Sequence, residues 1–392
     1  MLIFMGIEEF RNDMVKTMCE LVSIKSISPV SGGEGEGKRA DFIENMLKSW
    51  DLSPKRFDYT DEAGAKRSNL AVKYGNKERT IWILAHIDTV SEGDIAAWST
   101  DPFNAVVKDG KIFGRGTQDN GEGTIAALYT LRYLMGKQIK YNVGVIFAAD
   151  EEVGSKYGIQ KLLKENIFGK SDMFIVPDWG SKKGNEIEIA EKSIMWLKVT
   201  VNGKQVHAST PKKGVNSLRN AAKFMIEVDK ALHKKYKAKS NAFPSGSTFE
   251  MTKHEKNVDS TNIIPGKDVF YFDFRVIPDY SLDEIYNDIL AISSKYKKVR
   301  IDLEKVQEEQ AAPPTSTDSE IIRVLANSIK SELSMEPKFV GIGGGTVAAY
   351  LRKAGYSSAV WSIEEDIAHQ PNEYVIIENL VNVAKVFASI FV

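Results

Sequence analysis

The sequence predicts an α/β protein with a mixed central sheet flanked by helices, interrupted by an inserted ferredoxin-like α+β domain. Three observations support this fold class. The chain has 392 residues, which is too long for one ordinary core. Apolar strand-like runs alternate with helical patterns in its first and last parts. Its middle part has a different order of elements, which indicates a second domain.

The outer parts of the chain carry the alternating pattern. Apolar side chains recur at close to helical spacing over 7–22, and a second helical stretch follows a Ser/Gly-rich loop. Strands alternating with helices favour helical layers on a sheet. The expected strands are Asn69–Val72, Thr80–Ala85, Asn142–Ala149, Asp172–Val176 and Ser357–Trp361, and the expected helices include Arg39–Trp50, Gly121–Leu134 and Ser319–Leu333.

The middle of the chain has the order strand, helix, strand, strand, helix, strand, which is the ferredoxin-like arrangement. The outer pattern resumes after the sequence Ala311-Ala312-Pro313-Pro314. We therefore expect an inserted domain over 192–311 and a second domain made of 1–191 and 312–392. The expected elements of the insert are Met195–Val201, Asn216–Tyr236, Thr248–Lys253, Val269–Val276, Leu282–Tyr296 and Val299–Val306.

The composition excludes several classes of protein. A net charge of −1 implies no large basic face for nucleic acid. The single cysteine, Cys19, cannot form an intramolecular disulfide or a thiolate zinc cage, and it fits a reducing compartment. The N-terminal MLIFMG lacks the features of a signal peptide, and no apolar run approaches the roughly 18 residues of a membrane span. We therefore expect a cytoplasmic protein without nucleic-acid or membrane partners.

Acidic and imidazole side chains follow four of the expected strands. In open α/β sheets, ligands bind outside the carboxyl ends of the strands, so these side chains should approach one region. A further loop, Gly114–Asp119, adds a carboxylate just before a helix. The groups at the four strand ends are His86-Ile87-Asp88, Asp150-Glu151-Glu152, Pro177-Asp178 and an acidic loop that ends at His369.

Imidazole and carboxylate groups without sulfur suit zinc or a related divalent ion in a hydrolytic site. Two such ions can polarise a carbonyl and activate a shared water, and one carboxylate can bridge them. His86 and Asp88 are two residues apart, so the carboxylate can orient the imidazole. Taken singly, each group has an ordinary alternative: Asp119 as a helix cap, Asp178 as part of a turn and the paired glutamates as solvated surface.

Five segments resemble, in their order and spacing, the metallopeptidase family of aminoacylases, carboxypeptidase G, acetylornithine deacetylase, succinyl-diaminopimelate desuccinylase and several dipeptidases. The resemblance covers essentially the whole chain, and the ordered set is more specific than any one segment. The segments are HIDTV (86–90), GRGTQDNGEG (114–123), ADEEVGS (149–155), VPDWG (176–180) and AHQPNEY (368–374).

The resemblance implies a centre of two divalent metal ions, zinc in the first instance, with cobalt or manganese as alternatives. Asp119 would bridge the two ions, and Asp88 would orient His86. Glu151 would be the general base that takes a proton from the attacking water and returns it to the leaving amine. One ion would be held by His86 and Asp178, and the other by Glu152 and His369.

The resemblance also implies that the insert is a lid and dimerisation domain, so that the protein is a homodimer through 192–311. His207 would stabilise the oxyanion in the partner's site; an exposed surface histidine is the alternative. Arg275 would bind a substrate carboxylate, unless it pairs with a helix glutamate. The other expected substrate-binding residues are Asn262, Gly344, Gly345 and Thr346; several family members have an acidic residue shortly after this glycine loop, where this chain has Val347-Ala348-Ala349.

The expected function is therefore hydrolysis of a peptide bond in a small peptide, as in a dipeptidase or exopeptidase. Asp178 favours this choice, because family deacylases and carboxypeptidases tend to carry glutamate at that position. One alternative is an N-acyl amino-acid deacylase, such as a succinyl-diaminopimelate desuccinylase or acetylornithine deacetylase. An alternative of another class is a non-catalytic metal-binding dimerisation module.

Overall fold

A computed structural model describes residues 6–392. Residues 1–5 lie outside the described part. They include the predicted start of the outer domain and most of the segment MLIFMG. The chain divides into two compact units. Unit 1 comprises the residues up to Ile189, Thr315–Phe339 and Thr346–Val392; unit 2 comprises Ala190–Pro314 and Val340–Gly345. The sequence placed the short segment Val340–Gly345 with the outer domain, whereas here it groups with unit 2.

Within residues 6–392, the largest sheet has eight strands and is mixed, which confirms the predicted fold class. Its central strands β6, β3, β7 and β16 run parallel, so their carboxyl ends share one edge. The strands on either side are antiparallel to them. The order along the sheet is β1 (Lys55–Thr60), β2 (Lys66–Tyr74), β6 (Asn142–Ala148), β3 (Thr80–His86), β7 (Met173–Gly180), β16 (Ser357–Ser362), β8 (Glu186–Glu191) and β15 (Lys338–Ile342).

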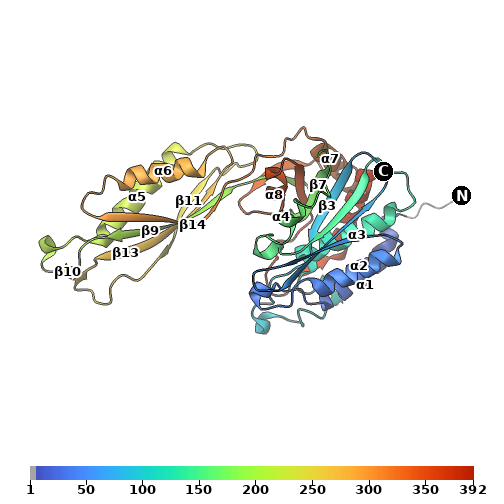
Figure 1. Cartoon of the computed structure of the whole chain (residues 1–392), viewed down its shortest axis with the longest axis horizontal. Coiled ribbons are helices and arrows are strands. Elements are labelled where there is room, and N and C mark those ends of the chain that lie inside the picture. The colour runs from blue at the N-terminus through green and yellow to red at the C-terminus, as the bar shows by residue number, and fades with distance from the viewer. Residues whose placement is uncertain (1–5) are drawn as a thin grey trace. The chain divides into compact units, whose positions relative to one another are not determined.

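Helices cover both faces of this sheet (Figure 1). On one face, Trp82, Phe174 and Val360 pack with α4 (Ile159–Leu162) and α8 (Ala348–Lys353). Burial of each such side chain is worth roughly 1.5–3 kcal/mol. The remaining helices include α3, which contacts β3 and β6, and α9, which packs on α3 and α7. Their bounds are α1 (Arg11–Ser23), α2 (Gly37–Ser49), α3 (Gly123–Leu134), α7 (Glu320–Leu333) and α9 (Ile377–Phe391).

The helix predicted from Gly121 begins two residues later, at Gly123. The preceding segment, Thr117–Glu122, forms a wide turn with non-helical backbone angles at Asp119 and Asn120 and a cis peptide bond between them. The turn has the sequence TQDNGE, which contains no apolar residue, so the apolar periodicity of α3 does not reveal the backbone change. The helix does not continue through Asp119.

The sequence did not predict β8, whose residues EIEIAE alternate between acidic and apolar. This alternation is typical of a strand with one solvated face, yet most of β8 is buried. The acidic face is tolerated because Glu188 accepts hydrogen bonds at 2.9 Å from the buried guanidinium of Arg352. A small sheet of β17 (Tyr374–Ile376), β5 (Lys111–Phe113) and β4 (Val106–Lys108) was also not predicted.

Unit 2 has the predicted ferredoxin-like order of elements. Its four strands form an antiparallel sheet in the order β11-β13-β9-β14. The helices α5 and α6 lie on one face of that sheet (Figure 1), over a core that includes Leu197, Phe272 and Ile289. The bounds are β9 (Ser193–Asn202), α5 (Ser217–Lys235), β11 (Thr248–His254), β13 (Lys267–Val276), α6 (Leu282–Ser293) and β14 (Arg300–Glu309); the short strand β10 (Val206–His207) pairs with β12 (Ile263–Ile264).

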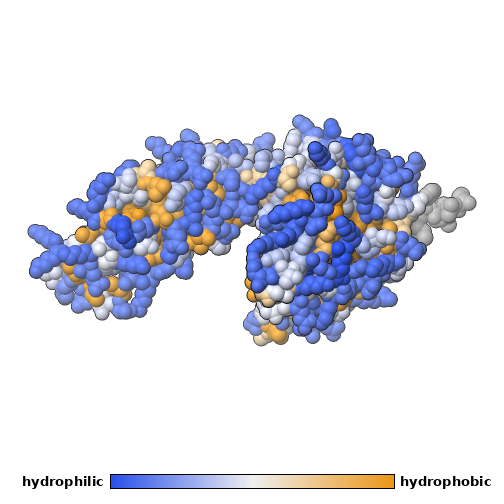
Figure 2. Space-filling model, in the orientation of Figure 1, coloured by the Kyte–Doolittle hydropathy of each residue, from blue (hydrophilic) through white to orange (hydrophobic). Residues whose placement is uncertain are grey.

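Among residues 6–392, no helix combines the length and the apolar character that crossing a membrane requires. Hydrophilic residues occupy most of the face drawn in Figure 2, with smaller apolar patches between them.

Candidate metal centre

The shared edge of the parallel strands brings together the residues predicted from the strand ends. His86 is the last residue of β3, and Asp178 lies near the end of the neighbouring strand β7. Glu152 lies in a short 3₁₀ turn directly after β6. His369 follows β16 in a loop, with a left-handed backbone (φ 64°). Because β6, β3, β7 and β16 are adjacent and parallel, residues distant in sequence meet here.

The carboxylate of Asp119 lies between two imidazoles. Its Oδ1 is 2.8 Å from Nε2 of His86, and its Oδ2 is 2.9 Å from Nε2 of His369. Each histidine faces one further carboxylate: Asp178 Oδ1 is 3.2 Å from His86 Nε2, and Glu152 Oε2 is 3.1 Å from His369 Nε2. Asp119 therefore belongs to two neighbouring groups of donors.

Each of these groups could hold a metal ion. One group is His86, Asp119 and Asp178, and the other is Asp119, Glu152 and His369; in each, the donor atoms lie within 4.8 Å of one another. Nitrogen and oxygen donors without sulfur suit zinc and related divalent ions. Asp119 offers a different oxygen to each group. This arrangement fits two ions that share one bridging carboxylate.

The electrostatics of the centre favour cations. Burial opposes the charged form of His86, but Asp178 and Asp119 outweigh it and raise the pKa of His86 well above its usual range. Hydrogen bonds with Asp119 and Glu152 raise the pKa of His369 to about 10. Without metal, each imidazole therefore carries the positive charge that the carboxylates attract.

Asp88 holds the glutamate pair through the backbone. Its Oδ1 and Oδ2 accept hydrogen bonds from the N–H groups of Glu151 and Glu152, each at 3.1 Å. Its backbone carbonyl lies 3.0 Å from Nδ1 of His86, and its Oδ1 lies 3.5 Å from the same atom. Asp88 thus links His86 to the turn that carries Glu151. Burial, with the negative charge of Asp178 nearby, raises the pKa of Glu151 well above its usual range.

A network of buried charged side chains, which the sequence did not reveal, lies next to the turn that carries Glu151. Arg67 donates from Nε to Oε1 of Glu36 at 3.0 Å, and its guanidinium lies 2.6 Å from Asp150 Oδ1. Asp150 directly precedes Glu151 and has a left-handed backbone (φ 69°). All three charged side chains are almost fully buried. The only sequence signal was the position of Asp150 beside Glu151.

Glu373 positions the loop that carries Asp119. It is fully buried and accepts hydrogen bonds from the backbone N–H groups of Gly116, Gln118 and Asp119 at 3.2, 3.0 and 3.1 Å. The side chain of Arg115 donates to it at 2.6 Å. Gly116 has φ 76°, which glycine adopts without strain. Glu373 belongs to the segment AHQPNEY, which was noted in the sequence, but the sequence did not predict that this glutamate binds the Asp119 loop.

Five of the six residues expected to act from the lid or on the substrate lie in unit 2. His207 is exposed on β10, with its Nδ1 2.7 Å from the Ser209 hydroxyl. Arg275 donates at 2.7 Å to Asp273 on its own strand and at 3.1 Å to the carbonyl of Gly343. Arg275 thereby contacts the glycine loop. Asn262, Gly344 and Gly345 belong to unit 2, and Thr346, whose hydroxyl accepts from Ala348 N at 3.1 Å, belongs to unit 1.

Removal of the Arg67 charge should unfold the protein more easily, because Glu36 and Asp150 would remain buried without a counter-ion. We expect Arg67→Met to lower the free energy of unfolding of the metal-free protein by about 3–5 kcal/mol, measured by urea denaturation. The matched control is Arg79→Met, whose partner Glu320 lies in a half-exposed pair. That change should cost about 1 kcal/mol or less. Equal losses in the two variants would contradict a structural role for the buried network.

Metal binding should release protons at pH 7. The raised pKa values keep His86 and His369 protonated in the metal-free protein, whereas a ligating imidazole must be neutral. The apparent affinity should therefore increase as pH rises toward 10, the pKa region of His369. Zinc titration calorimetry at pH 7 in buffers of different ionisation enthalpy measures the released protons. A heat of binding that is the same in every buffer would refute this linkage.

The chain is similar to known proteins over most of its length. Residues 82–392 match the peptidase family M20/M25/M40. An uncharacterized metallohydrolase of Methanocaldococcus jannaschii is 38% identical, over 96% of this chain and 98% of its own length. A succinyl-diaminopimelate desuccinylase of Nautilia profundicola is 26% identical, over 95% of this chain and 96% of its own length.

A solved structure has the same fold. The aminopeptidase PepT of Bacillus cereus superposes with a TM-score of 0.74 and 20% identity, over 97% of each chain. The family match covers most of the chain and includes every candidate metal-binding residue described above. The chain therefore belongs to the peptidase family M20/M25/M40 and is a metallohydrolase that acts on amide or peptide bonds.

Proposed function

We propose that this protein is a di-zinc hydrolase that cleaves the peptide bond of a small peptide, in the manner of a dipeptidase or related exopeptidase. The main evidence for this proposal is the position of the Asp119 carboxylate, whose two oxygens face the imidazoles of His86 and His369. This geometry supports two ions with His86 and Asp178 on one and Glu152 and His369 on the other. Zinc suits these donors, with cobalt or manganese as alternatives.

The residues around the centre have separate roles in this proposal. The two ions would polarise the substrate carbonyl and make the attacking water more acidic. Glu151 takes a proton from that water at its carboxylate and later gives it to the leaving amine. Asp88 keeps Glu151 in place through the backbone hydrogen bond.

The substrate carboxylate is proposed to bind in unit 2. Arg275 supplies a guanidinium beside the carbonyl of Gly343, and Gly344 and Gly345 supply backbone N–H groups. A side chain added at Gly344 would meet open space. The Thr346 hydroxyl and the Asn262 side chain would add polar contacts. This recognition serves a dipeptide and an N-acyl amino acid equally, since both end in a carboxylate.

A second candidate function is deacylation of an N-acyl amino acid. It is favoured by the likeness to a protein named succinyl-diaminopimelate desuccinylase. Asp178 favours the peptidase, because family deacylases and carboxypeptidases tend to carry glutamate at that position. The non-catalytic alternative is disfavoured, because the chain keeps the five candidate metal-binding residues and Glu151 together. We also propose a cytoplasmic location, since a single cysteine fits a reducing compartment.

Glu151→Gln should separate metal binding from turnover. We expect unchanged zinc content and fold, with kcat lower by at least about 10²-fold, because the variant cannot carry the transferred proton. The assay uses a panel of dipeptides and N-acyl amino acids with zinc, cobalt and manganese, which also decides between the two candidate substrates. Glu332→Gln, an exposed change on α7, should leave turnover unaltered. Near-normal turnover of Glu151→Gln would show that Glu151 is not the general base.

His207 is proposed to act in the partner's site of a homodimer formed through 192–311. It lies in the insert, far in sequence from every candidate metal-binding residue. Loss of one oxyanion donor costs about 10²–10³ in kcat, so His207→Ala should be nearly inactive while retaining zinc.

Subunit mixing tests this action in trans. His207→Ala and Glu151→Gln subunits, once exchanged, should form heterodimers in which one site has both intact groups. We expect activity approaching roughly one site in four of the wild type, a recovery that neither parent reaches. If exchange is proven by mass-tagged subunits and the mixture stays inactive, His207 does not act across a dimer.

A further inference from the structure

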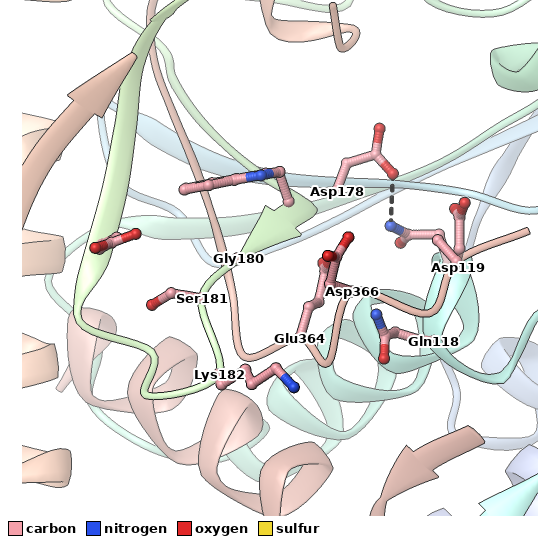
Figure 3. A pocket seen from close by; sticks show the side chains of 12 residues that line it. Gln118, Asp119, Asp178, Gly180, Ser181, Lys182, Glu364 and Asp366 are labelled. Carbon is pink, nitrogen blue, oxygen red and sulfur yellow. Dashed lines mark hydrogen bonds between the residues drawn. The ribbon is translucent and has the colours of Figure 1, made fainter. Parts of the chain in front are cut away.

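A cavity of about 520 Å³ opens beside the candidate metal centre. Asp119 and Asp178 line one part of it, and Glu364 and Asp366 line another (Figure 3). In Figure 3 the side chains of Glu364 and Asp366 extend toward the side of the cavity where Asp119 and Asp178 lie. A substrate bound at the metal centre therefore has room to extend a group toward Glu364.

Acidic side chains outside the metal centre also line the cavity. Asp119 and Asp178 would be neutralised by the ions they bind, but Glu186, Glu364 and Asp366 lie outside both candidate metal groups. The one cationic side chain among the lining residues is Lys182. Its Nζ lies 3.2 Å from Glu365, which does not line the cavity. Lys182 is thus already engaged with another carboxylate.

Glu364 has no counter-ion within the described part of the chain. Its side chain is half-buried, and its carboxylate makes no hydrogen bond or ion pair with any residue from 6 to 392; only its backbone N–H is bonded, to the carbonyl of Ser181 at 3.4 Å. A cation that binds beside a shielded, unpaired carboxyl group favours its charged form, and water screens their attraction less than it does at an exposed carboxylate. Asp366 is exposed, so water screens it more effectively. Glu364 is therefore the stronger of the two cation-binding positions.

A second observation indicates a ligand in the same cavity. Gln118 is 3% exposed, and its Nε2 has no hydrogen-bond partner in the described residues. Its Oε1 is held by the backbone N–H of Glu365 at 3.2 Å, which fixes the orientation of the amide. Figure 3 shows the Gln118 nitrogen turned toward Glu364 and Asp366. A buried donor without a partner is costly, and an oxygen atom of a ligand in the cavity would satisfy it.

Trp179 also lines the cavity. Indole faces attract organic cations, and a combination of carboxylates with tryptophan suits a protonated amine better than a hydrated metal ion. We infer that this cavity binds a protonated amine of the substrate, with Glu364 as the specificity-determining residue and Gln118 binding an oxygen near the amine. The inference rests on the proposed hydrolase function and narrows its substrates to those that carry an ammonium group.

The amine could be a free N-terminus or a basic side chain, and equilibrium binding distinguishes them. The protein is zinc-loaded Glu151→Gln, which does not consume the probes. L-alaninamide is compared with neutral N-acetyl-L-alaninamide, and N-acetyl-L-lysinamide with neutral N-acetyl-L-norleucinamide, by calorimetry. We expect the cationic member of one pair to bind at least about 10-fold more tightly than its neutral partner. The pair that shows the preference identifies the source of the amine.

Glu364→Gln added to this protein should remove the preference, whereas Glu332→Gln, an exposed change of the same charge on α7, should retain it. Asp366→Asn, at an exposed position, should give a smaller loss. Equal binding of both members in both pairs would overturn the inference. A preference that survives Glu364→Gln and Asp366→Asn alike would also overturn it. Because the readout needs no turnover, failure of the proposed hydrolysis would be seen separately in the dipeptide and N-acyl panel.

Discussion

One shared carboxylate organises the whole candidate site. Asp119 faces His86 with one oxygen and His369 with the other, so two donor groups are joined at a single residue. This geometry requires the Asp119 backbone to leave the helical path, which it does in the wide turn before α3. It also requires β3, β6, β7 and β16 to be parallel neighbours, since the remaining donors come from their carboxyl ends. The sheet and the turn together fix the distances on which the chemistry depends.

The carboxylates of the site are held by other buried charges rather than by packing alone. Glu373 gathers three backbone N–H groups around the Asp119 loop, and Asp88 binds the two N–H groups at the glutamate pair. Arg67 neutralises Glu36 and Asp150 beneath that pair. Buried ion pairs are expensive to form but strongly disfavour rearrangement once their hydrogen bonds are complete. These buried charges therefore cost free energy of folding, but they hold in place acidic side chains that would otherwise repel one another.

The balance of charge changes along the path from the metal centre into the neighbouring cavity. At the centre, divalent ions would neutralise Asp119 and Asp178. Further along, Glu364 lacks a counter-ion among residues 6–392, and the Gln118 amide lacks an acceptor. A metallohydrolase that acts on amide bonds needs to choose among many similar substrates, and uncompensated groups beside the reacting centre provide such a choice. Our proposals therefore assign the hydrolytic reaction and the selection of a substrate ammonium group to different residues of unit 1.

The sequence by itself determined the fold class and the candidate metal-binding residues. Strand-like runs followed by His86, Glu152 and Asp178 are visible in the local periodicity, and the ferredoxin-like order of the insert is visible in the same way. Only the tertiary structure decided which oxygens face which nitrogens, where the helix after Asp119 begins, and that Glu364 lies without a partner beside the centre. Side-chain contacts between residues hundreds of positions apart have no local signature. They are decided by strand order and burial, which act on the folded chain as a whole.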